Sequence, residues 1–222
     1  MKAGNHFYAI EDMPTQIPVF PLAGALLLPR GQLPLNIFEP RYLTMIDKAI
    51  AGNRMIGMIQ PIPEASGQGE GESLCAIGCA GRITAFAETG DDRYAVTLTG
   101  IARFRTRAEV EGGGPFRRFE VDWRPFIADF FDQVGEGGVD RNGLLSTFRS
   151  FLKANDLDAD WDAVNGMTTE VLVNALSMMS PYGPAEKQAL LEAPDLKTRA
   201  ATLVAITEMS LARASGESMP LQ

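Results

Sequence analysis

Residues 17–38 read IPVFPLAGALLLPRGQLPLNIF, an apolar stretch that carries a single charge, on Arg30. Four prolines interrupt it, and each of them removes a backbone donor and would break a membrane-spanning helix. The stretch also follows Glu11 and Asp12 rather than the basic segment that opens a signal peptide. We therefore predict a soluble, cytoplasmic protein with no membrane association, in which this stretch belongs to the folded chain.

The same stretch predicts two short strands, at 16–20 and 33–38, because its apolar runs are short and bounded by proline. The loop between them contains three consecutive leucines. From Tyr42 onward apolar residues recur three and four positions apart, which is the pattern of an amphipathic helix. Pro40 fits the first turn of this helix, and Gly52 fits the left-handed position just after its end.

Short apolar or alternating segments predict further strands, at 55–59, 81–87, 94–99, 101–107 and 119–123. From about residue 126 the spacing is helical, and we expect a long helix capped by Asp195 and three earlier ones, at 142–154, 168–179 and 184–192. The predicted fold class is α+β. Residues 1–124 form a mainly β pseudo-barrel with one inserted helix, and residues 125–222 form a helical bundle that packs against it.

Charge divides the chain at the same place. Residues 1–124 carry 13 Lys and Arg against 14 Asp and Glu, whereas residues 125–222 carry 7 against 14. Most Gly and Pro lie in the first part, where residues 61–73 are predicted to be a flexible loop. A net charge of −8 lacks the concentrated basic footprint of a general nucleic-acid binder. We therefore do not expect nucleic acid as a partner.

The sequence contains no convincing catalytic or metal-binding motif. It has no GxxxxGK[ST] phosphate loop, and the acidic run at 156–160 lacks the glycine and glutamate of an EF-hand loop. The S-x-x-K pattern at 150–153 has none of its companion motifs. His6 is the only histidine, and Cys75 and Cys79 lack the second pair that zinc needs, so we expect one or both of these thiols to be buried. We predict no enzyme activity, no cofactor and no metal.

Three arginines, Arg103, Arg105 and Arg107, alternate along one predicted strand. Two interpretations fit this pattern: a face that contacts RNA phosphates, or a cross-strand ladder with Glu120 and Asp122. We favour the ladder, because nearby carboxylates cancel most of the local positive charge. An RNA-contacting face at Arg103–Arg107 is the alternative.

Several stretches together resemble the N-terminal substrate-recognition domain of the Lon protease family. They are PVFPLAGALLLPRGQLPLNIFEPRY at 18–42, GCAGRI at 78–83, LTGIARFR at 98–105 and EKQALLE at 186–192. The resemblance covers residues 16–212 and implies a PUA-like β pseudo-barrel followed by a helical bundle. In Lon proteases, separate downstream domains hydrolyse ATP and cleave peptides. The resemblance therefore implies a stand-alone recognition domain without ATPase or protease domains.

We thus predict a non-enzymatic protein- or peptide-recognition module of protein quality control. Its expected partners are unfolded or damaged polypeptide segments, or another component of proteolysis, and the sequence does not determine an oligomeric state. Two interpretations stay open for the loop leucines: they pack in the core, or they are exposed on a proline-rigid loop, where they would bind apolar segments at a low ordering cost. The candidate partner-binding residues lie in and around that loop: Leu22, Leu26, Leu27, Leu28, Pro29, Arg30, Phe38 and Tyr42.

Overall fold

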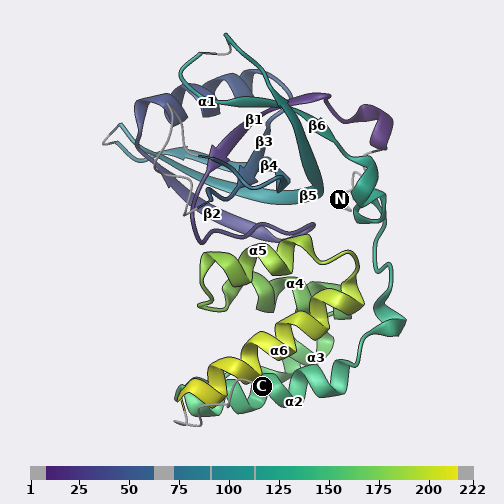
Figure 1. The fold of residues 1–222 in the computed structure, drawn as a ribbon. Coiled ribbons are helices and arrows are strands. Elements are labelled where there is room, and N and C mark those ends of the chain that lie inside the picture. Colours follow the sequence, from purple (N-terminus) through teal and green to yellow (C-terminus); the bar gives the residue numbers. More distant parts are fainter. Residues whose placement is uncertain (1–8, 63–72, 91, 113, 215–222) are drawn as a thin grey trace, which may run out of the picture.

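The computed structural model describes residues 9–62, 73–90, 92–112 and 114–214 (Figure 1). The strands are β1 Gln16–Pro21, β2 Gln32–Ile37, β3 Met55–Ile59, β4 Ile77–Glu88, β5 Tyr94–Glu109 and β6 Arg118–Asp122. The α-helices are α1 Pro40–Ala51, α2 Arg141–Ala154, α3 Trp161–Gly166, α4 Thr169–Met179, α5 Pro184–Glu192 and α6 Leu196–Ala214. Short 3-10 helices occur at η1 Ile10–Asp12, η3 Arg124–Phe130 and η4 Glu136–Gly138. The strands lie before residue 124 and most helices lie after it, which confirms the predicted α+β class. Most of the loop predicted at 61–73, and His6, lie outside the described residues.

The strands form one mixed sheet in the order β2-β5-β4-β3-β1-β6. Only β1 and β3 run parallel among these pairs, and an additional antiparallel pairing of β5 with β6 joins the sheet back on itself. Because β5 is long, its first half pairs with β2 and its second half with β6. Five of the described strands therefore form a closed ring, and β2 extends it as an edge strand.

The structure corrects the prediction of two strands at 94–99 and 101–107, which are halves of the single strand β5. The interruption read from the sequence is Gly100, whose backbone N–H donates to the Gly31 carbonyl (2.8 Å) and whose carbonyl accepts from the Arg30 N–H (2.8 Å). A Cβ at this position would overlap the carbonyl oxygen of Leu28. Gly100 therefore does not end the strand. Because Gly100 has no side chain, the leucine loop can pass closely over the strand at this position.

Helix α1 forms as its periodicity predicts. Pro40 occupies its first turn, and the face that includes Tyr42 and Met45 is buried against the sheet, with the Tyr42 ring edge-on to Phe20 at 4.3 Å. Gly52 does not adopt the expected left-handed conformation (φ −112°). Arg54 does, with φ 62°, and its N–H donates to the Ala49 carbonyl at 2.8 Å.

Helices α2, α3, α4 and α6 begin at side-chain caps, which satisfy backbone N–H groups that the helix itself leaves unpaired, whereas α5 begins at Pro184 without a side-chain cap. Asp140, Asp160 and Thr168 accept from the first turns of α2, α3 and α4. Asp195 accepts the Thr198 N–H at 2.7 Å at the start of α6, as predicted. Hydrogen bonding with Thr198 lowers the pKa of the Asp195 carboxyl. The acidic run at 156–160 therefore supplies a helix cap rather than a calcium loop.

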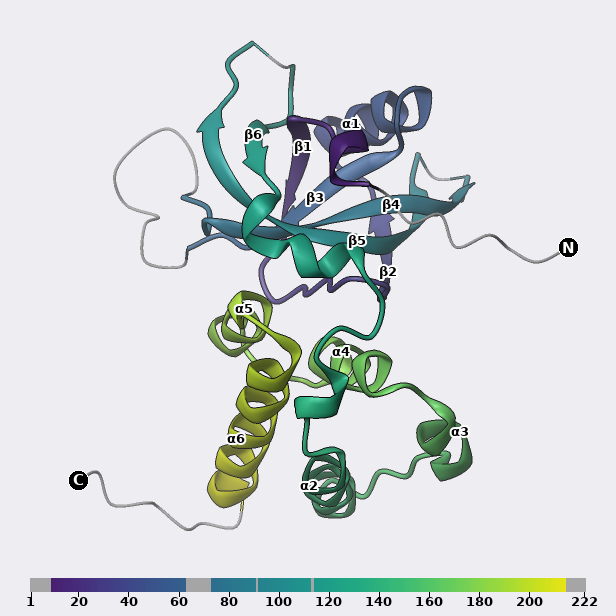
Figure 2. The same cartoon turned by 90° about the vertical axis from the view of Figure 1, so that its right-hand side faces the viewer.

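The two parts of the chain lie against each other. The sheet and α1 form one end of the molecule, helices α2–α6 form the other, and α4 and α5 lie closest to the sheet (Figures 1 and 2). A single apolar cluster includes loop residues, sheet residues and residues of α4, α5 and α6. The sheet and the helices therefore share part of one core. A division into subdomains at residue 124 stays a prediction.

Candidate recognition surface

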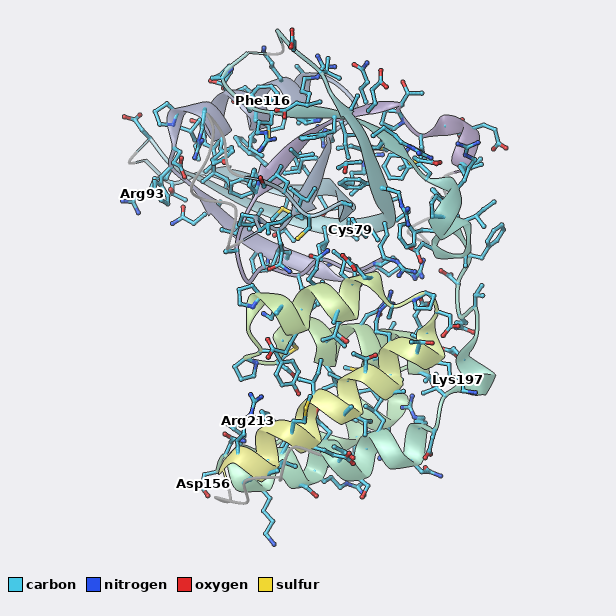
Figure 3. All side chains as sticks on the ribbon, in the orientation of Figure 1. Cys79, Arg93, Phe116, Asp156, Lys197 and Arg213 are labelled. Carbon is cyan, nitrogen blue, oxygen red and sulfur yellow. The ribbon has the colours of Figure 1, made fainter. Side chains whose placement is uncertain are left out.

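The leucine loop, residues 22–31, packs against residues of the sheet and of α4. Side chains of the sheet and of the helices meet in this part of the molecule (Figure 3). Leu26, Leu27 and Leu28 are 2%, 1% and 0% exposed. Pro29 is also buried, and so is Tyr42 on α1. This corrects the expectation that the loop leucines face a partner. They are part of the core, where each contributes roughly 1.5–3 kcal/mol by leaving water.

Backbone hydrogen bonds explain this orientation. The Leu22 N–H donates to the Ile59 carbonyl (3.0 Å), and the Gly24 N–H donates to the Gln60 side chain (3.0 Å). At the other end of the loop, the Asn174 side chain of α4 donates to the Pro29 carbonyl (3.1 Å). The loop is therefore tied to the sheet and to α4, and its leucines fill the space between them.

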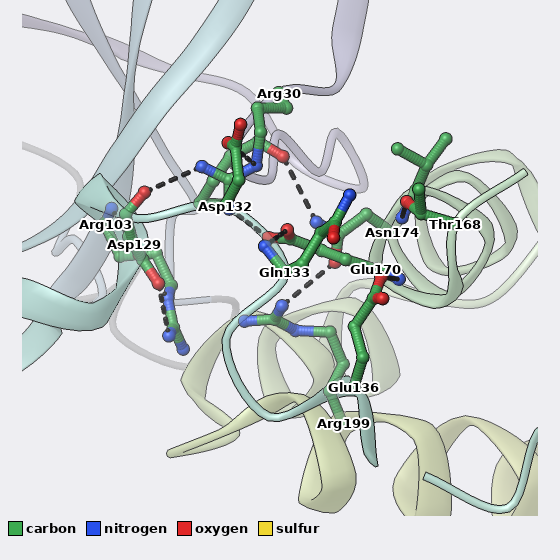
Figure 4. Close-up of polar contacts among 12 residues, drawn as sticks. Arg30, Arg103, Asp129, Asp132, Gln133, Glu136, Thr168, Glu170, Asn174 and Arg199 are labelled. Atoms are coloured by element: carbon green, nitrogen blue, oxygen red, sulfur yellow. Dashed lines mark hydrogen bonds and ion pairs between the residues drawn. The ribbon is translucent and has the colours of Figure 1, made fainter. Parts of the chain in front are cut away.

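Arg30 and Glu170 hold the end of this loop against the segment that connects the sheet to the helices (Figure 4). The Arg30 guanidinium forms an ion pair with Glu170 and also donates to the Asp129 carbonyl at 2.8 Å. Glu170 accepts in addition the backbone N–H of Gln133 (2.9 Å). Arg30 and Gln133 both have left-handed backbone (φ 65° and 60°), which is costly for residues other than glycine. One buried carboxylate thus fixes two unfavourable turns.

Arg103 forms the second part of this junction and is 3% exposed. Its Nε and Nη2 donate to the two carboxylate oxygens of Asp129, both at 2.8 Å, and its backbone N–H donates to Asp129 Oδ2 at 2.9 Å. Its remaining donor, Nη1, reaches the carbonyls of Leu191 and Ala193 at the end of α5. Arg103 is therefore absent from the predicted ladder and cannot contact RNA phosphates at the surface.

The rest of the predicted ladder is present in part. Arg105 is exposed and lies opposite Asp122 in the β5–β6 register, and Arg107 forms an ion pair with Asp122. Arg124 binds the same carboxylate at 2.9 Å. The hydrogen bonds from Arg124 and Arg107 hold the pKa of Asp122 well below its usual range. These contacts neutralise part of the basic face that the RNA alternative requires.

Arg199 completes the junction from α6. It is 3% exposed, and it donates to Asn174 Oδ1 (2.9 Å) and to the Leu190 carbonyl (3.0 Å). Burial, together with the nearby charge of Arg103, lowers the pKa of Arg199 to about 10. Since Asn174 also binds the Pro29 carbonyl, polar contacts run without interruption from the leucine loop through α4 to α6.

The charged groups of this junction bind one another and backbone carbonyls. Cys79 lies beside it, but burial raises the pKa of its thiol well above the ordinary value, so it is inert as a nucleophile. The described ranges also contain no group of three His, Cys, Asp or Glu side chains that could hold a metal ion. The arginines and carboxylates position the loop and the helices, and the surface available to a partner lies elsewhere.

Among the predicted partner-binding residues, Phe38 is the most exposed, at 60%. It lies at the end of β2, with the Arg93 guanidinium 5.8 Å from its ring centroid. Pro34 lies in the middle of this edge strand and lacks an N–H, which disfavours addition of a peptide strand there. Leu22 and Arg30 are partly buried. Phe38 therefore offers a side-chain contact at the sheet end.

A further exposed segment, absent from the predicted site residues, is the connector, which we define as residues 124–139. Ile127, Phe131 and Val134 are all exposed along it. Beside it lies a groove of about 690 Å³, lined by Ala9, Ile10, Glu11, Ile127, Phe130, Phe131 and Asp132. The available signal was FIADFF at 126–131, an aromatic-rich run directly before a glycine-rich turn. Further exposed apolar side chains lie on and just before α4: Met167, Val171 and Met179.

Comparison with known proteins identifies the family. Residues 16–208 match the model of the ATP-dependent protease La (LON) substrate-binding domain. The chain belongs to this family. It is 30% identical over 199 residues to Lon protease 2 of Myxococcus xanthus and 25% identical over 205 residues to the Lon protease of Desulfosudis oleivorans. Both alignments cover 85% of this chain but only 23% of the relative, so the chain spans about a quarter of the length of these proteases.

Solved structures show the same fold. A Lon N-terminal domain protein from Xanthomonas campestris has a TM-score of 0.61 at 21% identity, covering 86% of this chain and 98% of that one. The N-terminal domain of the Mycobacterium avium complex Lon protease also has a TM-score of 0.61, at 18% identity, covering 87% and 98%. Within the described part of this chain, no helix is both long and apolar enough to span a membrane.

Proposed function

We propose that this chain is a non-enzymatic recognition module that binds unfolded or damaged polypeptide segments, or a component of proteolysis, in protein quality control. The observation that carries the proposal is the match of the substrate-binding domain over residues 16–208. Exposed apolar side chains on the connector, on α4 and at Phe38 support it, because such groups bind the apolar side chains that an unfolded chain exposes.

Two finer points belong to the same proposal. The closed ring formed by β5, β4, β3, β1 and β6 supports a PUA-like pseudo-barrel, followed by a helical bundle. Both cysteines are free thiols, which supports a reducing compartment such as the cytoplasm. The RNA alternative has lost its strongest support, because Arg103 is buried at the junction.

Fluorescence anisotropy tests the proposal directly. A labelled protein held unfolded by reduction and carboxymethylation is titrated with this chain, and the same labelled protein in its folded form is the matched control. We expect saturable binding of the unfolded form only, without ATP and without cleavage of the labelled chain. An absence of binding to a panel of unfolded proteins would refute the proposal.

A further inference from the structure

The connector groove presents apolar side chains on a fixed backbone. Ile127 and Phe131 are 52% and 59% exposed beside it, and Phe130 forms a buried part of its lining. On the sheet side, the Trp123 indole N–H donates to the Pro14 carbonyl at 2.9 Å. A surface that is already ordered binds a partner at a lower entropic cost than a flexible one.

Both sides of the connector are anchored. Asp129 accepts three hydrogen bonds from Arg103, and the Gln133 N–H donates to Glu170 of α4. Phe131 lies between these two anchors, and its own N–H donates to the Ala128 carbonyl at 3.1 Å. The junction that buries the leucine loop therefore also holds Phe131 in place at the surface.

The charged residues that line the groove are acidic. Its lining includes two carboxylates, Glu11 and Asp132, and none of the described lining residues is cationic. Asp12 follows Glu11 in the same 3-10 helix and is also exposed. Asp132 forms an ion pair with Arg30 at 3.7 Å, and the same guanidinium is also bound to Glu170. The groove thus combines apolar side chains with an acidic rim.

We propose that this groove binds polypeptide segments in which large apolar side chains lie next to Lys or Arg. The apolar side chains would pack on Ile127 and Phe131, and the basic ones would approach Glu11 and Asp132, an arrangement in which charge gives selectivity. The inference rests on the proposed function and adds a site and a substrate class to it.

Two labelled peptides of equal length and identical Phe and Leu content provide the test, one flanked by Lys and the other by Glu. We expect wild-type protein to bind the Lys-flanked peptide about tenfold more tightly at low salt. The double variant Ile127→Ser/Phe131→Ser should lose about tenfold in affinity. The matched control Leu157→Ser, which removes a side chain that is 56% exposed and lies outside the surfaces assigned to binding, should stay within about twofold. Asp132→Lys should reduce the preference for the Lys-flanked peptide while circular dichroism shows an unchanged fold.

The outcomes separate the groove from the proposed function. If the double variant binds the Lys-flanked peptide like wild type, the groove assignment is wrong while the recognition function stands. If wild type binds neither peptide and no unfolded protein, the recognition function fails and the groove proposal with it. Affinity that appears only after residues 1–8 are deleted would assign the groove to the chain's own N-terminus. If the wild-type protein forms a dimer that the double variant does not form, the groove would be assigned to a second copy of the chain. Either result overturns the proposal.

Discussion

The leucine loop and the connector are both apolar segments outside the regular sheet and helices, yet one is core and the other is surface. Loop residues Leu26–Leu28 are almost completely buried, whereas Ile127 and Phe131 of the connector are more than half exposed. The loop passes between the sheet and α4, so its side chains find apolar neighbours on both sides. The connector runs along the outside from the sheet to α2 (Figure 2).

The connector also divides its own side chains between the two environments. Phe126, Asp129 and Phe130 are buried, while Ile127 and Phe131 are exposed. The segment is kinked at Phe126, and two of its buried side chains contact Arg103. The Arg103 guanidinium lies 4.4 Å from the Phe126 ring centroid and forms an ion pair with Asp129. The polar contacts that anchor the backbone therefore decide where an apolar run lies, and here these are the contacts of Asp129 and Glu170.

The largest expected effect comes from removing the Asp129 carboxylate, which anchors the connector to Arg103 of β5. Asp129→Ala leaves the buried Arg103 guanidinium without its carboxylate partner, and we expect a loss of about 3–5 kcal/mol in the free energy of unfolding. Urea denaturation measures it. Asp132→Ala, on the same connector but half-exposed, is the control and should cost less than about 1 kcal/mol. Equal effects of the two substitutions would show that the junction does not organise the connector.

A direct comparison of the two segments follows. Leu28→Ala should cost about 2–5 kcal/mol, because it leaves a cavity in the shared core. Ile127→Ala should change the free energy of unfolding by no more than about 0.5 kcal/mol. Substituting the loop leucines is therefore a test of stability rather than of binding. A tolerant Leu28 or a sensitive Ile127 in the same urea titrations would contradict this account.

A smaller effect should depend on pH. Hydrogen bonds from Arg124 and Arg107 lower the pKa of Asp122 in the folded protein, so its ion pairs stabilise the fold above the unfolded-state pKa of about 3.9 and lose that effect as the pH falls. The difference in urea midpoint between wild type and Asp122→Asn should therefore shrink when the pH is lowered from 7 to about 3. A difference that grows on acidification would contradict the assignment.

Much of the regular structure could be predicted from local sequence. The periodicity from Tyr42 predicted α1, and Asp195 predicted the start of α6. The errors have a common physical origin. Gly100 was interpreted as a strand break because the close approach of Leu28 is a tertiary contact, and Arg103 was assigned to a ladder because its true partner, Asp129, lies on an irregular segment.

The recognition surface was harder to predict for the same reason. Hydrophobicity identified the loop leucines, but the Asn174 and Gln60 contacts that turn them inward come from residues far along the chain. Phe131 escaped notice because its exposure depends on Glu170 holding the following turn at Gln133. The family could be recognised from short motifs, whereas the exposure of each side chain required the assembled junction.

Hydrogen–deuterium exchange on the full chain, with and without a saturating concentration of the Lys-flanked apolar peptide, measures which of the two segments a partner covers. Because the connector presents the exposed apolar side chains and the leucine loop is core, we predict new protection at 127–134 and at 10–12 and no change at 22–31. New protection at 22–31, with the connector unchanged, would contradict the account and return the leucine loop to the role of partner-binding surface.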